Sequence, residues 1–345
     1  MNIIFVIASL EGFGGTNRVA TSLANGLSKN HNITVISKHS HRNTYQLSNR
    51  VKDTKFEGNS LSFISQCNQY IALNYPDIVI IHTMGKLTPA LLIGGIKAQS
   101  IWSIEHISYD FHSLLYKQLR KRLYKKVDKI ITLTKNDALN YKPFHSDVTV
   151  MANPTPLQLK TDKIIGVSKT LNNIVSIGRL TYQKGFDRLI KAWSLVEAKY
   201  PNWTLSIYGE GEDKEKLEKI IMDKNLKNII LKGLTNDIQA AYDNAAFYVM
   251  SSRFEGLPVV LIEAQSRGLP IVSFDCPSGP AEIVHHNIDG LLVENGNTVA
   301  LANAMIKMME EPQLRQKMAN QALKSAQAYH IDEIIEQWLH LLKNS

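Results

Sequence analysis

The sequence predicts an α/β protein built from two doubly wound parallel sheets. Short β-rich runs alternate with helical stretches from end to end, a pattern typical of parallel sheets with helices on both faces. With 345 residues, the chain is too long for one ordinary hydrophobic core, so two domains are expected. Hydrophobic residues make up 44% of the chain and charged residues 20%, which indicates a soluble globular protein.

Twelve candidate strands fall into two groups of six, which favours two domains over a single sheet. The first group is Ile3–Ala8, Ile33–Ser37, Ile78–His82, Ile101–Ile104, Lys129–Leu133 and Val148–Met151. The second group is Ile174–Ile177, Thr204–Tyr208, Ile229–Leu231, Phe247–Met250, Ile271–Phe274 and Gly290–Val293. Helical periodicity fills the intervals, as in Asp187–Lys199 and Thr298–Met309.

The two domains are expected to join within Asn153–Thr170, a stretch with two prolines, several polar residues and no clear period. We therefore expect an N-terminal domain over residues 1–160 and a C-terminal domain over residues 161–327. The last helical pattern, Ile331–Leu342, carries an apolar stripe and has no strand after it. Residues 328–345 are therefore expected to pack back on the N-terminal domain.

Charge is distributed unevenly between the two halves. Residues 1–160 carry 19 Lys+Arg against 9 Asp+Glu, whereas the remainder carries 20 against 22. The first half is therefore expected to meet an anionic surface or ligand. The two cysteines, Cys67 and Cys276, lie far apart and suggest no disulfide framework, which favours a cytoplasmic location. No apolar run reaches the ~20 residues of a spanning helix, and the apolar start predicts a buried strand rather than a signal peptide.

Open parallel sheets bind ligands at the carboxyl ends of their strands, and the first informative motif lies there. Gly178–Gly185 follows a candidate strand and carries two cations. Arg179 can hold a phosphate bidentately, while Lys184 supplies a mobile point charge. Paired cations at this position would stabilise a departing diphosphate. The alternative is a solvated basic loop.

The second motif, Phe254–Glu263, follows the candidate strand Phe247–Met250. Pro258 suits the first turn of a helix, and the amides of Gly256 and Leu257 would then be free to bind an anion. Glu255 precedes this helix and Glu263 lies about five residues inside it, roughly 7–8 Å further along the axis. That spacing suits one carboxylate for a transferred sugar and the other for ribose hydroxyls. The alternative is a dipole-complementing acid and an unrelated surface glutamate.

Together, three motifs resemble glycosyltransferase family 4, whose GT-B fold has two Rossmann-like domains facing each other across a cleft. They are the Arg-x4-Lys-Gly loop, the Gly209-Glu210-Gly211 turn, and the Glu-x7-Glu spacing within Phe-Glu-Gly-Leu-Pro. The resemblance covers nearly the whole chain and is strongest over Gly178–Val293. It implies retaining transfer without a metal, with the donor held mainly by the second domain.

By this resemblance, Arg179 and Lys184 contact the diphosphate of the donor. Glu263 binds the ribose, and Glu255 holds the donor sugar near its reacting face. The loop around Gly233–Leu234 lies by the base.

Two N-terminal features also resemble the family. In the glycine loop after the first strand, Gly14 and Gly15 would let the backbone approach the donor phosphates, although tight turns need glycine anyway. Asn17 stands where many relatives have an acidic residue. His106 ends another strand and would touch the donor sugar, in positioning or charge stabilisation, with a purely structural histidine as the alternative.

No metal or other cofactor is expected. The chain has no Asp-x-Asp pair, and its cations can serve the diphosphate instead. The loop Asp275–Glu282 predicts a helix start with Ser278 or Gly279 at the cap and Pro280 in the first turn. The form of this loop resembles family members that build bacterial surface polysaccharides, although a capped surface loop is an equal alternative.

A basic amphipathic segment spans 114–126. Its leucines recur at four-residue spacing, and six cations lie within Lys117–Lys126. One interpretation is a solvated helix packed on its sheet. The other is peripheral contact with anionic lipid headgroups at the inner face of the cytoplasmic membrane, or with a lipid-diphosphate acceptor. Nucleic acid is a weaker candidate, because this domain is already assigned to sugar transfer.

The expected function is therefore retaining, metal-independent transfer of a hexose or N-acetylhexosamine from a nucleotide diphosphate sugar. UDP is the first nucleotide expected and GDP the second. The acceptor would be a glycan or lipid-linked saccharide in bacterial surface polysaccharide or lipopolysaccharide biosynthesis. The alternatives are a nucleotide-sugar epimerase, a glycosyl phosphorylase of the same architecture, or a non-catalytic nucleotide-sugar binding module. A nicotinamide-dependent dehydrogenase would need an acidic residue where Ser37 and Lys38 stand.

Overall fold

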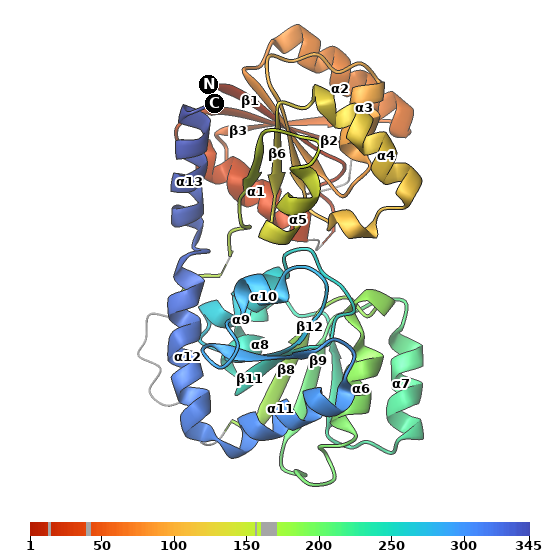
Figure 1. Cartoon of the computed structure of the whole chain (residues 1–345), viewed down its shortest axis with the longest axis vertical. Coiled ribbons are helices and arrows are strands. Elements are labelled where there is room, and N and C mark those ends of the chain that lie inside the picture. The colour runs from red at the N-terminus through yellow and green to blue at the C-terminus, as the bar shows by residue number, and fades with distance from the viewer. Residues whose placement is uncertain (13–14, 39–42, 156, 160–170) are drawn as a thin grey trace. The chain divides into compact units, whose positions relative to one another are not determined.

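The computed structural model of the chain describes residues 1–12, 15–38, 43–155, 157–159 and 171–345. The chain divides into two compact units (Figure 1). Unit 1 comprises Met1–Pro156 together with Ile331–Ser345, and unit 2 comprises Leu157–His330. The boundaries at 156 and 330 lie four and three residues from those expected at 160 and 327.

Unit 1 contains a seven-stranded sheet in the order β3-β2-β1-β4-β5-β6-β7, with every neighbouring pair parallel. Its strands are β1 (Asn2–Ile7), β2 (Asn32–Lys38), β3 (Val51–Phe56), β4 (Ile78–Thr83), β5 (Ile101–Glu105), β6 (Lys129–Thr132) and β7 (Val148–Val150). The central strands β4 and β5 are buried along their whole length, as expected where helices cover both faces. The chain order reverses between β1 and β4, which is the position where doubly wound sheets bind ligands.

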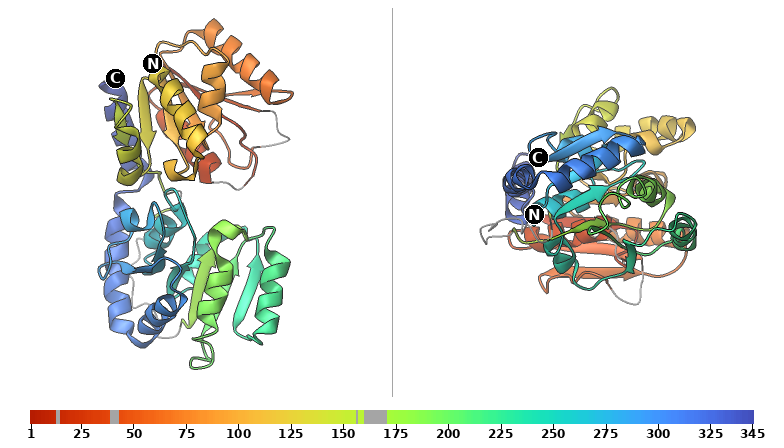
Figure 2. Two further views of the ribbon diagram at one scale, coloured as in Figure 1. Left: turned by 45° about the vertical axis from the view of Figure 1, so that its right-hand side comes forward. Right: turned by 90° about the horizontal axis from the view of Figure 1, so that it is seen from below.

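The helices of unit 1 alternate with the strands except after β2, where β3 is the next element that the structure describes (Figures 1 and 2). They are α1 (Gly15–Leu27), α2 (Ser60–Asn74), α3 (Leu87–Ile93), α4 (Leu114–Leu123), α5 (Lys135–Tyr141) and α13 (Ile331–Lys343), with short 3-10 turns at Tyr109–Phe111 and Tyr124–Lys126. The last helix, α13, packs against α1, where a Cβ at Gly26 would overlap the side chain of Ile335. Trp338 of the same helix is buried, with its ring 6.5 Å from that of Trp102.

Strand β3 is absent from the twelve expected strands, and the first group of six was wrong in this respect. Three of its six residues are charged, namely Lys52, Asp53 and Lys55, so no apolar alternation marks it. It lies at the edge of the sheet, where charged side chains are tolerated because one side of the strand faces solvent.

Unit 2 contains a six-stranded parallel sheet in the order β10-β9-β8-β11-β12-β13. The strands are β8 (Asn173–Ile177), β9 (Thr204–Tyr208), β10 (Ile229–Gly233), β11 (Phe247–Met250), β12 (Ile271–Asp275) and β13 (Gly290–Glu294). The chain order reverses between β8 and β11. Both units therefore confirm the doubly wound α/β class.

Seven helices of unit 2 surround this sheet within the described residues 171–330 (Figure 2). They are α6 (Phe186–Trp193), α7 (Lys214–Asp223), α8 (Ile238–Asp243), α9 (Val259–Ser266), α10 (Pro280–Ile283), α11 (Thr298–Glu310) and α12 (Pro312–Gln327), with a 3-10 turn at Tyr182–Lys184. Helix α6 ends six residues before the expected Lys199, and turns follow it. The buried Val196 in those turns continues the apolar period, so the pattern indicated burial there rather than helix.

Across the described segments, no helix is both long enough and apolar enough to span a bilayer.

Candidate active site

The loops that follow β8 and β11 lie at the reversal point of the unit 2 sheet. Both carry residues that the sequence singles out. Lys184 of the first loop donates to Glu255 Oε1 of the second, with Nζ and Oε1 2.7 Å apart. Ser252 Oγ donates to the same carboxylate oxygen at 2.6 Å. Glu255 is 5% exposed, so these two donors hold a nearly enclosed carboxylate.

Several further bonds join the two loops, and the sequence motifs did not reveal them. Gln183 Nε2 donates to the carbonyl of Phe254, and the amide of Arg253 donates to the carbonyl of Gln183. The Arg253 guanidinium pairs with Asp187 at 2.6 Å and lies 4.0 Å from the centre of the Tyr182 ring. These partners are about 70 residues apart in the chain, so no local pattern could have identified them.

Glycines allow the loops after β8, β9 and β10 to approach closely. Gly209 has a φ of +142°, donates to the carbonyl of Gly233 at 2.8 Å, and has no room for a Cβ beside the carbonyl of Gly178. Leu234 follows β10 and is 66% exposed. Gly233–Leu234 therefore lies at the carboxyl ends of the strands of the same sheet as Arg179, which is exposed at the end of β8.

Glu263 lies on α9 and is held by a tyrosine of a neighbouring helix. It is the fifth residue of α9, is 5% exposed, and accepts a 2.8 Å hydrogen bond from the hydroxyl of Tyr242. Pro258 is the N-cap of this helix, with φ −73° and ψ 91°, so its expected place in the first turn was wrong. The extended ψ of Pro258 starts the helix one residue later, at Val259.

The start of α9 also contacts the loop that follows β12. Gly279 has a φ of +94° and caps α10, whose first residue is Pro280, so the expected helix start is confirmed. A Cβ at Gly279 would overlap the carbonyl oxygen of Gly256, which shows how tightly the two loops pack. Within the described residues, the amides of Gly256 and Leu257 donate no hydrogen bond.

In unit 1, His106 directly follows β5 and is 8% exposed. Its Nε2 lies 3.1 Å from Nδ1 of His82, and its amide donates to the carbonyl of Thr83. Burial lowers the pKa of His106 to about 4, so the ring is neutral at neutral pH. Of the glycine loop, Gly14 lies outside the described residues, while Gly15 is exposed at the first position of α1.

Comparison with known proteins identifies the family. Residues 13–159 match the model for Glycosyltransferase Family 4, and residues 158–325 match the model for glycosyl transferases group 1. The amylovoran biosynthesis glycosyltransferase AmsD of Erwinia amylovora is 30% identical, with 99% of each chain covered. The chain belongs to glycosyltransferase family 4.

Two further similarities extend over the whole glycosyltransferase. One is with the GalNAc-alpha-(1->4)-GalNAc-alpha-(1->3)-diNAcBac-PP-undecaprenol alpha-1,4-N-acetyl-D-galactosaminyltransferase of Campylobacter jejuni, at 27% identity over 99% of this chain and 98% of the relative. The other is with the crystal structure of Anabaena Alr3699/HepE in complex with UDP, at a TM-score of 0.82, 17% identity and full coverage of both chains. The two parallel-sheet units of the glycosyltransferase are the GT-B architecture.

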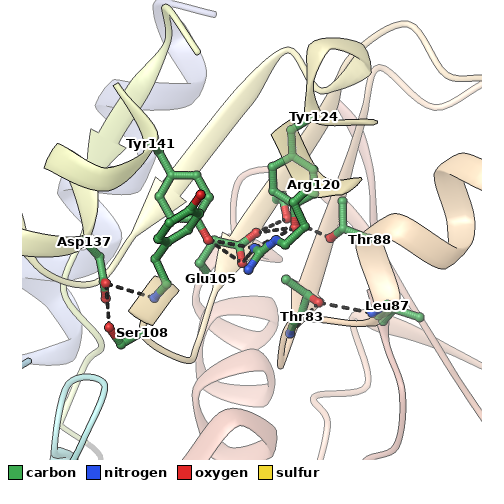
Figure 3. A network of polar contacts seen from close by, with 12 residues as sticks. Thr83, Leu87, Thr88, Glu105, Ser108, Arg120, Tyr124, Asp137 and Tyr141 are labelled. Carbon is green, nitrogen blue, oxygen red and sulfur yellow. Dashed lines mark hydrogen bonds and ion pairs between the residues drawn. The ribbon is translucent and has the colours of Figure 1, made fainter. Parts of the chain in front are cut away.

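The basic segment of the glycosyltransferase differs from expectation at Arg120. The structure turns this residue inward, where it pairs with Glu105 and donates to the hydroxyls of Tyr124 and Tyr141 (Figure 3). Burial opposes the charge on the guanidinium, but the Glu105 carboxylate and the tyrosines outweigh it and raise the pKa of Arg120. Counting Arg120 among the surface cations was wrong, because helical spacing does not identify a buried partner on another element.

Much of the rest of this segment faces solvent. Leu114 and Leu115 are 79% and 81% exposed, whereas Leu123, at the other end of the leucine stripe, packs against the hydrophobic core of unit 1. Four cations nearby are also exposed, namely Lys121, Arg122, Lys125 and Lys126. Lys117 instead lies 3.5 Å from Asp110, with its ammonium 4.9 Å from the centre of the Tyr109 ring.

In the part of the chain that the structure describes, no cluster of three or more His, Cys, Asp or Glu side chains is arranged to hold a metal ion.

Proposed function

We propose that this glycosyltransferase transfers a hexose or N-acetylhexosamine from a UDP-sugar to a glycan or lipid-linked saccharide, with retention at the anomeric carbon and without a metal. The pathway we propose is bacterial surface polysaccharide biosynthesis. The observation that carries the proposal is the junction of the loops after β8 and β11, where Lys184, Glu255 and Ser252 meet at the reversal point of the sheet.

The cations and the start of α9 suit a diphosphate leaving group. Lys184 has three N–H donors and uses one on Glu255, so two are available to phosphate oxygens. Arg179 is exposed on the same loop. The amides of Gly256 and Leu257 precede a helix whose dipole favours negative charge at that end. These groups would stabilise the charge that develops on the diphosphate as the glycosidic bond breaks.

The two carboxylates suit the remaining parts of the donor. Glu263, fixed by Tyr242, is assigned to the ribose hydroxyls, and Glu255 is assigned to the donor sugar. Gly233–Leu234 is assigned to the base. UDP is proposed as the nucleotide because the structurally similar Anabaena protein is described in complex with UDP.

The acceptor hydroxyl is proposed to attack the anomeric carbon on the face from which the diphosphate departs. The bond from the anomeric carbon to the donor phosphate oxygen breaks, and that oxygen takes the proton of the acceptor hydroxyl. A lipid-linked saccharide is proposed among the acceptors because the name of the Campylobacter jejuni relative includes an undecaprenol-linked saccharide. The neutral ring of His106 suits a role in positioning the sugar rather than in stabilising charge.

A donor screen followed by product analysis tests this proposal. Thermal shifts are measured with a panel of UDP- and GDP-sugars, and the donor that raises the melting temperature is incubated with candidate acceptors. A longer glycan with a retained α or β configuration at the donor carbon, formed in the presence of EDTA, is the expected product. A rearranged nucleotide sugar would support an epimerase, a sugar phosphate would support a phosphorylase, and binding without turnover would support a binding module. Any of these three results refutes the proposed transfer.

We also propose that the exposed part of the basic segment contacts an anionic lipid surface. Leu114 and Leu115 would enter the headgroup region while Lys121 and Arg122 meet the lipid phosphates. Sedimentation with vesicles should show binding to phosphatidylglycerol-containing membranes that falls with salt and with Leu114→Ser/Leu115→Ser. Equal binding to neutral phosphatidylcholine vesicles would contradict the electrostatic part of this proposal.

A further inference from the structure

The buried histidine pair at the end of β4 and β5 has a defined direction of hydrogen bonding. We propose that His82 is a positioning residue that donates from Nδ1 to His106 Nε2, so that His106 carries its proton on Nδ1. The assignment of the tautomer does not depend on the function proposed above. The consequence for transfer rests on the function proposed above, because it assumes that His106 meets the donor sugar.

The two rings form an in-plane hydrogen bond. Nδ1 of His82 and Nε2 of His106 are 3.1 Å apart, and the ring planes differ by only 14°. The ring centres are 5.3 Å apart, which exceeds the N–N distance by about two ring radii. Two rings stacked face to face would not place these two nitrogens on the line that joins the ring centres. The contact is therefore an N–H···N bond along the line of the rings.

The backbone holds this geometry. Strands β4 and β5 pair in parallel register, with His82 opposite Ile104 and Thr83 opposite Glu105. The ladder continues one step beyond the strand, because the amide of His106 donates to the carbonyl of Thr83 at 3.0 Å. His106 follows Ile104 by two residues and therefore points to the same face of the sheet as His82.

A single proton lies between the two nitrogens, because both rings are neutral. Burial lowers the pKa of His82 well below its ordinary value, and burial also lowers that of His106. In one arrangement His106 donates from Nε2, and His82 must then carry its own proton on its Nε2. In the other arrangement His82 donates from Nδ1, and its Nε2 carries only a lone pair.

The environment of His82 Nε2 decides between these arrangements. This atom is enclosed and has no hydrogen-bond partner in the part of the chain that the structure describes. An enclosed N–H without an acceptor is rarer in proteins than an acceptor without a donor. The second arrangement avoids the orphaned N–H. His106 then has its Nε2 occupied by His82, and its Nδ1–H remains as the donor that a ligand can meet.

The direction of the bond gives His106 a specific chemical role. A neutral imidazole with its proton on Nδ1 offers a hydrogen-bond donor, and would bind a sugar hydroxyl oxygen or a phosphate oxygen as acceptor. With the opposite tautomer the same nitrogen would offer only a lone pair. His82 therefore acts on the substrate through His106 rather than by touching it.

The tautomer can be measured directly in the wild-type enzyme. Long-range ¹H–¹⁵N correlation spectra of protein labelled with ¹⁵N-histidine distinguish a protonated ring nitrogen from an unprotonated one, and the His106→Gln spectrum assigns the signal. The expected result is a protonated Nδ1 and an unprotonated Nε2 for His106 at pH 7.5. A protonated Nε2 in the wild type overturns the proposal without any variant of His82.

Two substitutions at His82 then test its role. His82→Phe keeps a ring beside Phe5, whose centre lies 4.9 Å from that of His82, but removes the donor. His82→Asn keeps an N–H donor near the position of Nδ1. The ¹⁵N shift of His106 Nε2 is expected to lose the signature of an accepted hydrogen bond in His82→Phe and to keep it in His82→Asn. An Nε2 shift that is unchanged in a folded His82→Phe protein overturns the proposal.

The kinetic test separates this inference from the proposed function. In His82→Phe we expect kcat to fall about tenfold, as for one lost charge-neutral hydrogen bond in the transition state, and His82→Asn to recover most of it. KM for the donor should change less than kcat. If no donor or acceptor supports transfer but the tautomer is as stated, the proposed function fails and the assignment stands. If transfer is measurable and His82→Phe matches the wild type, the positioning role is refuted.

Discussion

Two cation–glutamate pairs, one in each unit, lie near the ends of central strands, and their side chains differ in exposure to solvent. In unit 1 the Arg120 and Glu105 side chains are 0% and 1% exposed. In unit 2 the Lys184 and Glu255 side chains are 18% and 7% exposed. An enclosed guanidinium has no access to a ligand, whereas a partly exposed lysine can donate hydrogen bonds to a ligand. The comparison indicates a structural pair in unit 1 and agrees with the donor-binding role that we propose for the pair in unit 2.

Breaking the enclosed pair should have the largest effect on stability. Arg120→Met leaves the Glu105 carboxylate buried without its cation, so we expect a loss of about 3–5 kcal/mol in the free energy of unfolding. Urea denaturation measures this loss. Lys121→Met, on the same helix but exposed, is the control and should change stability by less than about 0.5 kcal/mol. Equal effects of the two substitutions would show that Arg120 is not a structural cation.

Breaking the accessible pair should instead affect turnover. Lys184→Ala removes a cation from the proposed diphosphate site, and we expect kcat to fall about 10²- to 10³-fold in the transfer assay, by analogy with the removal of one transition-state donor. Its loss of stability should be smaller than that of Arg120→Met.

Lys199→Ala is the matched control for this second pair. Lys199 lies 3.6 Å from Glu310 in an ion pair whose two side chains are 67% and 51% exposed. Near-normal turnover in Lys184→Ala, similar to that of Lys199→Ala, would refute the proposed role of Lys184 in turnover.

Glycines in the loops after β1 and β8 provide a third test. Gly185 has a φ of +64°, and a Cβ there would overlap the carbonyl oxygen of Ser251. Gly185→Ala should cost about 1–3 kcal/mol and displace the adjacent Lys184. Gly15 has nothing within 4 Å of an added Cβ, so Gly15→Ala should leave stability within about 0.5 kcal/mol of the wild type. Thermal unfolding of both variants checks the contrast.

A further expected effect is on the pH dependence of stability. Burial lowers the pKa of His106 from 6.5 to about 4, so between these pH values the folded chain binds fewer protons than the unfolded chain. The contribution of this neutral histidine is complete above pH 6.5 and is lost as pH falls toward 4. His106→Leu should therefore lose less stability over that interval than the wild type. Parallel profiles from urea titrations would contradict the assignment of a buried neutral ring.

The alternation of strands and helices was readable from the sequence because it is local. Apolar runs and glycine-terminated motifs predicted two doubly wound sheets, and the position of Glu263 inside a helix follows from the short spacing after Pro258. Strand β3 was missed because its charged residues lie at a sheet edge and show no alternation. The helix start after β12 was found because Gly279 and Pro280 are local signals.

Only the tertiary structure decided which polar groups meet. Lys184 and Glu255 are 71 residues apart, and Arg253 reaches Asp187 across 66 residues. Arg120 belongs to a helix that the sequence marks as basic and exposed, yet it turns to a glutamate 15 residues earlier on β5. His82 was not singled out at all, although it bonds to His106. Side-chain partners depend on how distant strands are ordered in a sheet, and a period measured along one element contains no information about that order.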